Sequence, residues 1–232
     1  MSRCTALAAA WVAVLAVMAA TAGPGSAAAE PATAAGKVHN AAKPKIRWNP
    51  IPFPAKRKRE MRAYAIRHYG LHTFQLKHPK VIVEHFTETS TWQAAFNTFA
   101  PDVADPELHE KPGTCAHFVV DQYGVIHQLV SIGTMCRHTV GLNWTSVGIE
   151  HVGFSDAQVL GNARQMRASL ALTCWLRGRE HVALSNVIGH NESLRSPFHH
   201  ERVARLRTQT HDDFKRSDMQ RYRKRVAARC GK

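Results

Sequence analysis

The chain has 232 residues, 44% of them hydrophobic, which is enough for one sizeable core and suits a single domain with short extensions. Its formal net charge of +14 and its pI near 10.1 indicate a surface that attracts polyanions. The sequence has no zinc-finger, ribonucleoprotein or helix-turn-helix signature, so charge alone would have to support a nucleic-acid-binding function. Nucleic acid is therefore not expected as a partner, and a solvated basic face is the simpler alternative.

Residues 1–29 have the pattern of a signal peptide. An arginine lies near the start, an apolar run covers residues 6–22, and the small residues after it fit cleavage behind Ala29. The run is nearly long enough to span a bilayer, so a membrane anchor is the alternative. The small residues favour cleavage. We expect the mature chain to be secreted or held in the cell envelope, with no stable membrane insertion after cleavage.

Residues 30–56 are rich in Ala, Pro and Lys and predict a flexible arm. The periodic part of the chain, residues 57–232, follows this arm. Its first stretch, residues 58–70, has apolar residues near helical spacing and ends in Gly70. This pattern predicts a helix that stops at the glycine.

The stretch VIVEHFTET, residues 81–89, predicts a strand with a histidine at its end. Because strand side chains alternate between faces, Val81, Val83 and His85 should share one face of the sheet. His85 would then stand at the carboxyl end of the strand, where α/β sheets bind their ligands. A histidine that is hydrogen-bonded inside the core is the alternative.

The rest of the chain alternates predicted strands and helices without an internal repeat. The predicted elements are a helix over 90–99 that begins with a capping box of Ser90 and Gln93, a loop over 101–113, a β-hairpin over 115–130, a strand over 146–153, a helix over 156–179 with Asp156 as its N-cap, a strand over 186–190, and a basic helix over 217–230 capped by Ser217 or Asp218. This interleaving predicts a single α/β domain with a central mixed β-sheet flanked by helices.

The cysteines predict disulfide bonds if the chain is exported. Cys4 would leave with the signal peptide, and the four that remain allow three connectivities. We favour Cys115 with Cys136 and Cys174 with Cys230. Metal ligation is the alternative, but the sequence has no C-x-x-C pair to support a zinc ribbon.

Two further histidines share the setting of His85. His190 ends the short apolar strand in VIGH, and His211 lies in the polar stretch RTQTHDDF. Three converging imidazoles could hold a zinc ion and leave a fourth position for water. The chain has 15 histidines, so accidental triplets are common and core or surface histidines are the alternative.

Four segments together resemble a known family. The segments are VIVEHFTET, CAHFVVDQYGVIHQLV, HTVGLNWTSVGIEHVG and NVIGHNES. Their order and separations are similar to those of the type-2 N-acetylmuramoyl-L-alanine amidases, a family that includes amidase-type phage lysozymes and peptidoglycan recognition proteins. The resemblance covers residues 57 to 229. It implies a mixed sheet flanked by helices, with zinc (Zn²⁺) in an open cleft, and hydrolysis of the amide between N-acetylmuramic acid and L-alanine.

The resemblance also assigns metal ligands. It places the first two on His85 and His190. The third family ligand is an aspartate or a cysteine, and the position is most simply taken here by His211, with Asp212 as the second choice. Gln209 then stands where many members have a lysine, and its amide could donate a hydrogen bond to a developing oxyanion.

Glu150 matches the catalytic glutamate of the family, so the resemblance implies a general base that takes a proton from the attacking water. A structural salt bridge is the alternative. Expected substrate contacts, each with an equally simple structural alternative, are Thr87, His117, His138, Asn143 and Trp144. Glu192 could support His190 from behind. The expected partner is peptidoglycan, together with anionic wall polymers on the basic surface, and non-catalytic peptidoglycan recognition is the alternative function.

Overall fold

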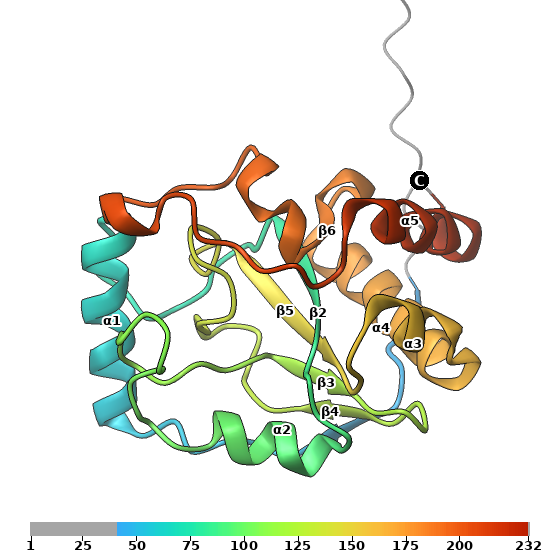
Figure 1. Cartoon of the computed structure of the whole chain (residues 1–232), viewed down its shortest axis with the longest axis horizontal. Helices are drawn as coiled ribbons and strands as arrows, with labels where there is room; N and C mark the ends of the chain where they lie inside the picture. The colour runs from blue at the N-terminus through green and yellow to red at the C-terminus, as the bar shows by residue number, and fades with distance from the viewer. Residues whose placement is uncertain (1–40, 232) are drawn as a thin grey trace, which may run out of the picture. The chain divides into compact units, whose positions relative to one another are not determined.

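The computed structural model of the protein describes residues 41–231, so the predicted signal peptide and the first part of the predicted arm lie outside the described residues. A six-stranded sheet with the order β1-β4-β3-β5-β2-β6 forms the centre of the domain (Figure 1). The strands are β1 (Ile46–Trp48), β2 (Val81–Phe86), β3 (Phe118–Val120), β4 (Ile126–Gln128), β5 (Ser146–His151) and β6 (Val187–Gly189). Only the hairpin of β3 and β4 is antiparallel. The predicted mixed sheet is confirmed.

The edge strand β1 lies within the stretch that the sequence predicts to be a flexible arm. Its residue Ile46 pairs with Ile126 of β4, and the backbone N–H of Ile51 donates to the carbonyl of Leu129 at 3.0 Å. Ladder hydrogen bonds of this kind hold the segment against the sheet. The second part of the predicted arm, from residue 46 onward, is therefore ordered, because pairing with β4 outweighs its loop-like composition.

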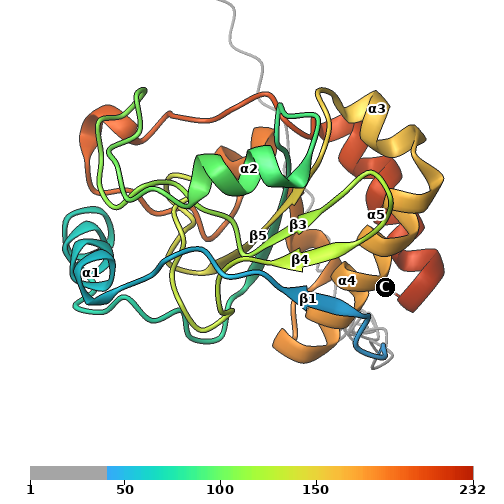
Figure 2. The same ribbon diagram turned by 90° about the horizontal axis from the view of Figure 1, so that it is seen from below.

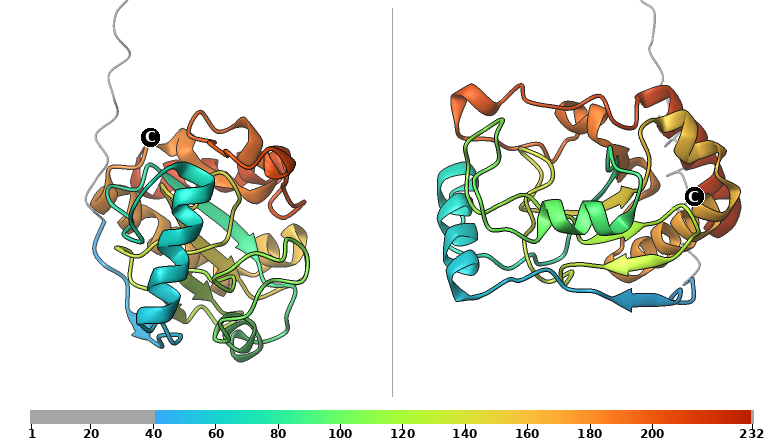
Figure 3. Two further views of the ribbon diagram at one scale, coloured as in Figure 1. Left: turned by 90° about the vertical axis from the view of Figure 1, so that its left-hand side faces the viewer. Right: turned by 60° about the horizontal axis from the view of Figure 1, so that its bottom comes forward.

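Helices cover both faces of the sheet. They are α1 (Ala55–Tyr69), α2 (Trp92–Phe99), α3 (Asp156–Gly161), α4 (Ala163–Glu180) and α5 (Arg216–Cys230), with short 3₁₀ turns η1 (Leu184–Asn186), η2 (His190–Arg195) and η3 (Ala204–Leu206). α2 packs on one face, and α4 and α5 contribute to the core on the other (Figure 2). α1 stands at the end of the domain away from α3, α4 and α5 (Figure 3). Among the residues that the structure describes, no helix combines the length and apolar character needed to cross a bilayer.

The ends of the first two helices show how local signals set their limits. Gly70 follows α1 with φ of 75°, a left-handed conformation that glycine adopts without strain, and this confirms the predicted stop. At α2 the cap is Thr91, whose hydroxyl accepts the N–H of Ala94 at 3.1 Å. The predicted cap, Ser90, is therefore wrong by one residue, since the neighbouring threonine has the same chemistry.

The predicted helix over 156–179 is in fact two helices. Asn162 interrupts it with an extended ψ of 100°, and its side chain caps α4 by accepting the N–H groups of Arg164 and Gln165. Asp156 is the first residue of α3 and not its cap. Its carboxylate instead accepts the N–H groups of Phe214 and Lys215, at 3.0 and 2.8 Å. These donors precede α5, so Asp156 holds the segment that enters the helix. The N-cap position is Lys215, without a side-chain cap, so the predicted caps Ser217 and Asp218 are wrong.

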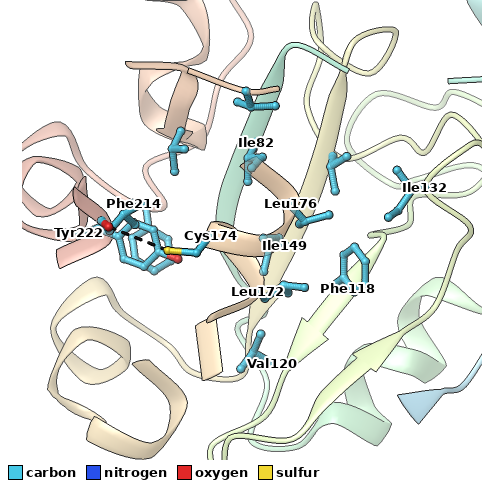
Figure 4. Packing of buried hydrophobic residues seen from close by; sticks show 14 of the residues in the cluster. Ile82, Phe118, Val120, Ile132, Ile149, Leu172, Cys174, Leu176, Phe214 and Tyr222 are labelled. Atoms are coloured by element: carbon cyan, nitrogen blue, oxygen red, sulfur yellow. Dashed lines mark hydrogen bonds between the residues drawn. The ribbon is translucent and has the colours of Figure 1, made fainter. Parts of the chain in front are cut away.

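The main core lies between the sheet and the helices α4 and α5, and Figure 4 shows it from close by. Its labelled aliphatic and aromatic members from the sheet and α4 are Ile82, Phe118, Val120, Ile149, Leu172 and Leu176. Cys174 in this core is bonded to Cys230 at the end of α5, and Cys115 is bonded to Cys136. The favoured disulfide pairing is confirmed.

A buried carboxyl group sits among these core residues. Glu84 is on β2, and its Oε1 accepts the hydroxyl of Thr173 at 2.9 Å. The Thr173 hydroxyl is in turn 2.8 Å from that of Tyr222. Burial raises the pKa of Glu84 to about 7, and the hydrogen bonds from Thr173 and Tyr222 offset this only in part. The folded protein therefore favours the protonated carboxylic acid at this position.

Glu84→Gln should remove a pH dependence of stability. The pKa of Glu84 is higher in the folded chain, so its stabilising contribution is complete below pH 4.5 and is lost as the pH rises through about 7. At pH 8 the free energy of unfolding of the metal-free variant should be about 1–3 kcal/mol higher than that of the metal-free wild type. At pH 4.5 the two values should be similar. Urea unfolding at both pH values measures this difference. Glu180→Gln, at an exposed ion pair, is the control, and an equal stability difference at both pH values would contradict the prediction.

Candidate metal and catalytic site

The register of the parallel strands places three polar side chains in one row. His85 on β2 pairs with Glu150 on β5, and Glu84 pairs with Gly189 at the end of β6. The next residue after Gly189 is His190, so it lies beside His85, with ring centroids 4.8 Å apart. The row is at the carboxyl ends of parallel strands, where the sheet leaves side chains free to meet a ligand.

Asp213 joins this row from the segment before α5. Its carboxylate oxygens lie 2.9 Å from Nδ1 of His85 and 3.3 Å from Nδ1 of His190. One donor atom from each of the three residues lies within 4.8 Å of the others, so the group can hold a metal ion. Gly189 makes the approach possible, because a Cβ there would overlap the carbonyl oxygen of Phe214. The sequence TQTHDDF carries three potential ligands in a row, and only the packing against β6 selects Asp213.

The predicted third ligand, His211, is not part of this cluster. Its ring stacks on His190 at a centroid distance of 4.8 Å, and its Nε2 lies 3.1 Å from a carboxylate oxygen of Glu107. Gln209 donates to the other oxygen of Glu107 at 3.3 Å. Asp212, the second choice from the sequence, accepts the side-chain amide of Asn191. His211, Asp212 and Gln209 therefore line the cleft, but their side chains bond to Glu107 and Asn191 and not to the cluster.

Burial and charge set the ionisation of the cluster. Burial opposes a charge on Asp213, but hydrogen bonds from His190 and His85 hold its pKa well below the usual range. Burial lowers the pKa of His190 to about 4. Burial also acts against His85, but the hydrogen bond and charge of Asp213 outweigh it and raise the pKa of His85. An ionised carboxylate beside a neutral imidazole is the form in which these groups bind metal.

Glu150 is the fourth polar group of the site. Its side chain is 8% exposed, and one of its carboxylate oxygens has no hydrogen-bond partner. Burial raises its pKa to about 7, while the neighbouring His85 acts in the opposite direction. Nε2 of His190 is a second buried polar atom without a partner. Unpartnered polar atoms beside the three clustered side chains fit a site that takes up an ion and water.

The row lies on the floor of a cleft of about 480 Å³. Of the predicted substrate-contact residues, Thr87, His138 and Asn143 line this cleft. The hydroxyl of Thr87 accepts the backbone N–H of Thr89 in its own turn, at 3.2 Å. Asn143 accepts the backbone N–H groups of His138 and Thr139, both at 2.8 Å. Its amide therefore holds the loop that carries His138.

The other two predicted contacts do not reach the cleft. His117 is fully buried, and its ring nitrogens bind the backbone of Thr134 and Gly148, each at 3.0 Å. Trp144 donates its indole N–H to the carbonyl of Gly141 and packs against the main core. In both cases backbone partners or the core satisfy the side chain. These contacts fit the structural alternative for the two positions.

Two buried arginines that carry no functional signal in the sequence shape one wall of the cleft. Arg57 donates to five backbone carbonyls, including those of Gly113 and Thr114. Arg137 pairs with Asp105 at 2.6 Å and donates to carbonyls of the same wall. Together they hold the loop over 101–114 in place. Glu192 was expected to support His190, but its carboxylate does not bond to that ring. It accepts the N–H of Gly189, the residue before His190, and pairs with Arg223.

Fold and site together define an α/β protein with a candidate metal centre and a buried carboxyl group in an open cleft. A family model described as N-acetylmuramoyl-L-alanine amidase matches residues 75–213, more than half of the chain, so the chain belongs to this family. It is therefore an N-acetylmuramoyl-L-alanine amidase, an enzyme that acts on peptidoglycan. The matched region begins shortly before β2 and ends at Asp213, the third member of the cluster.

Solved structures with a similar fold are remote in sequence. The endolysin LysCS, an N-acetylmuramoyl-L-alanine amidase from Clostridium intestinale, is 19% identical, with a TM-score of 0.44 over 66% of this chain and 84% of that one. The amidase AmiD from E. coli, solved with an anhydro-muramoyl peptide, is 20% identical, with a TM-score of 0.39 over 50% of each chain. Peptidoglycan recognition protein-LE is 19% identical, with a TM-score of 0.42 over 51% of this chain and 72% of that one. No curated protein matches the chain.

Proposed function

We propose that the protein is a secreted, zinc-dependent amidase that cleaves the bond between N-acetylmuramic acid and L-alanine in peptidoglycan. The observation that supports this most directly is the cluster of His85, His190 and Asp213, with donor atoms within 4.8 Å of one another, beside the buried Glu150. Two imidazoles and one carboxylate form a donor set that suits zinc and leaves a coordination position for water. A bound zinc ion would supply a Lewis acid that polarises the amide carbonyl and acidifies water.

Glu150 supplies the proton transfer in this proposal. It pairs with His85 across the sheet, so its carboxylate stands next to the proposed ligands on the cleft floor. A carboxyl group with a pKa near 7 can take a proton from water and return it to a leaving nitrogen at neutral pH. The cleft, of about 480 Å³, would hold the lactyl group and the first residues of the stem peptide.

Export is a second part of the proposal. The two disulfides are of the kind that persists in oxidising compartments, and peptidoglycan lies outside the cytoplasmic membrane. Exposed basic side chains on α5, including Arg216, Lys224 and Arg229, would face anionic wall polymers, although this contact stays a prediction from charge.

The purified mature protein should contain about one zinc ion per chain and should lose activity when a chelator removes it. Elemental analysis measures the zinc. Mass spectrometry of products from purified muropeptides identifies the bond that is cut, and added zinc should restore the activity. Undiminished cleavage by metal-free protein would contradict zinc dependence. Binding of muropeptides without cleavage by the zinc-loaded protein would instead support the recognition function.

A further inference from the structure

A hydrogen-bond chain begins at the nitrogen of His85 that faces away from Asp213. While Nδ1 of His85 meets the carboxylate, its Nε2 lies 3.2 Å from Nδ1 of His138 and 3.3 Å from the hydroxyl of Thr139. The other nitrogen of His138 is 3.3 Å from the hydroxyl of Ser146, which donates to the carbonyl of Leu142 at 2.8 Å. The ring nitrogens of His138 thus join His85 to the backbone.

The direction of this chain follows from its last member. A carbonyl oxygen only accepts, so the single hydroxyl proton of Ser146 goes to Leu142 and the Ser146 oxygen accepts from Nε2–H of His138. A neutral imidazole carries a single proton, so a His138 ring that donates from Nε2 has a bare Nδ1, which can only accept. The proton between the two rings must then be on Nε2 of His85.

The Thr139 hydroxyl fits the same assignment. It is 2.9 Å from Nδ1 of His138 and 3.3 Å from Nε2 of His85. If the hydroxyl donates to His138, its oxygen accepts the proton of His85 Nε2. This assignment leaves the proton of a neutral His85 on Nε2 and the lone pair on Nδ1, the atom that faces His190 and Asp213.

The position of the His138 ring is tightly fixed. Its backbone N–H donates to Asn143, and its ring lies against β5 at Gly148, where a Cβ would be 2.7 Å from the His138 ring. The other imidazole of the cluster has no such support, because Nε2 of His190 has no partner. The chain of hydrogen bonds therefore acts on one metal ligand only.

We propose that His138 is a positioning residue which, with Thr139 and Ser146, holds His85 in the tautomer that presents Nδ1 to the metal. This inference rests on the proposed metal site, but it concerns residues to which the family resemblance gives no metal role. Partners of this type fix the tautomer and orientation of ligating histidines, and their loss weakens metal binding by about 10- to 100-fold.

Zinc affinity tests the proposal without relying on turnover. His138→Leu should weaken zinc binding about 10- to 100-fold in a chelator competition assay, whereas His138→Asn, which keeps an acceptor close to the position of Nδ1, should recover part of that loss. Ser146→Ala should give a smaller loss. His127→Leu is the matched control, because His127 is also a buried histidine but bonds to Asn49 and Asp121 away from the cluster. Zinc affinity unchanged in His138→Leu would overturn the proposal.

The tautomer itself gives an independent readout. Long-range proton–nitrogen NMR correlations should show His138 protonated at Nε2 and bare at Nδ1 in both the metal-free and the zinc-loaded protein, and His85 protonated at Nε2 when zinc is bound. A protein that binds zinc but carries the His138 proton on Nδ1 would contradict the hydrogen-bond chain and leave the proposed metal site standing. If the wild type binds no zinc but His138 has the expected tautomer, the metal site is wrong and the hydrogen-bond chain stands.

Discussion

Glu150→Gln should lower turnover by about 100- to 10,000-fold while the protein keeps its fold and its zinc. Glutamine has nearly the same shape, but it cannot take a proton from water. Glu150 is also not one of the three clustered ligands, so the metal should stay bound. Steady-state cleavage of a muramoyl peptide, together with zinc analysis of the same sample, measures both effects.

The pH profile of the wild type strengthens this test. The base works only as the carboxylate, so activity should rise with pH through the pKa of Glu150, which is about 7 in the metal-free protein and lower beside a bound cation. In Glu150→Gln this rise of activity with pH should be absent. Glu180→Gln, at the exposed end of α4, serves as the control and should behave like the wild type. Unchanged turnover in Glu150→Gln would assign the residue a structural role.

Asp213→Ala should abolish hydrolysis and weaken zinc binding by more than about 100-fold. Even a residue that only hydrogen-bonds to a metal ligand contributes about 10- to 100-fold to metal affinity, and a direct ligand should contribute more. His211→Ala should keep the zinc, since the His211 ring only stacks on His190 and bonds to Glu107. Its activity should fall, because the ring lines the cleft. Zinc titration and muropeptide cleavage of the two variants distinguish the ligand from its neighbour.

Two further variants make the assignment sharper. Asp213→Cys should retain part of the zinc affinity, because tetrahedral zinc accepts sulfur as well as oxygen. Asp212→Asn should keep both zinc and activity, since Asp212 bonds to Asn191 outside the cluster. The reverse pattern, with zinc lost in His211→Ala and kept in Asp213→Ala, would restore His211 as the third ligand.

Short-range patterns were sufficient to predict the strands at the site. Alternation in VIVEHF predicts that His85 stands at the strand end on the face of Val81 and Val83, and the parallel register pairs it with Glu150. The place of Asp213 in the cluster was not predictable in this way. Its position depends on how a loop approaches Gly189, and no periodicity in TQTHDDF distinguishes Asp213 from the two residues before it.

The remaining differences between the sequence-based expectations and the structure share a physical cause. A buried imidazole or indole has the same sequence pattern whether it meets a ligand or a backbone group. His117 and Trp144 both find backbone partners, while His138, from the same family-like motifs, reaches the cleft. Local capping signals also failed at α5, where the N-cap is Lys215 and the nearby carboxylate of Asp156 bonds only to the N–H groups of Phe214 and Lys215.

The wide separation in sequence of His85, His190 and Asp213 affects the stability of the whole domain. An ion that only the folded chain binds would join segments that lie far apart in the sequence, so the domain could unfold only after the ion is released. Stability would also depend on the concentration of free metal, with a gain of about 2.7 kcal/mol when the metal exceeds its dissociation constant a hundredfold. The ion would then act as a third, reversible cross-link beside the bonds of Cys115 to Cys136 and Cys174 to Cys230.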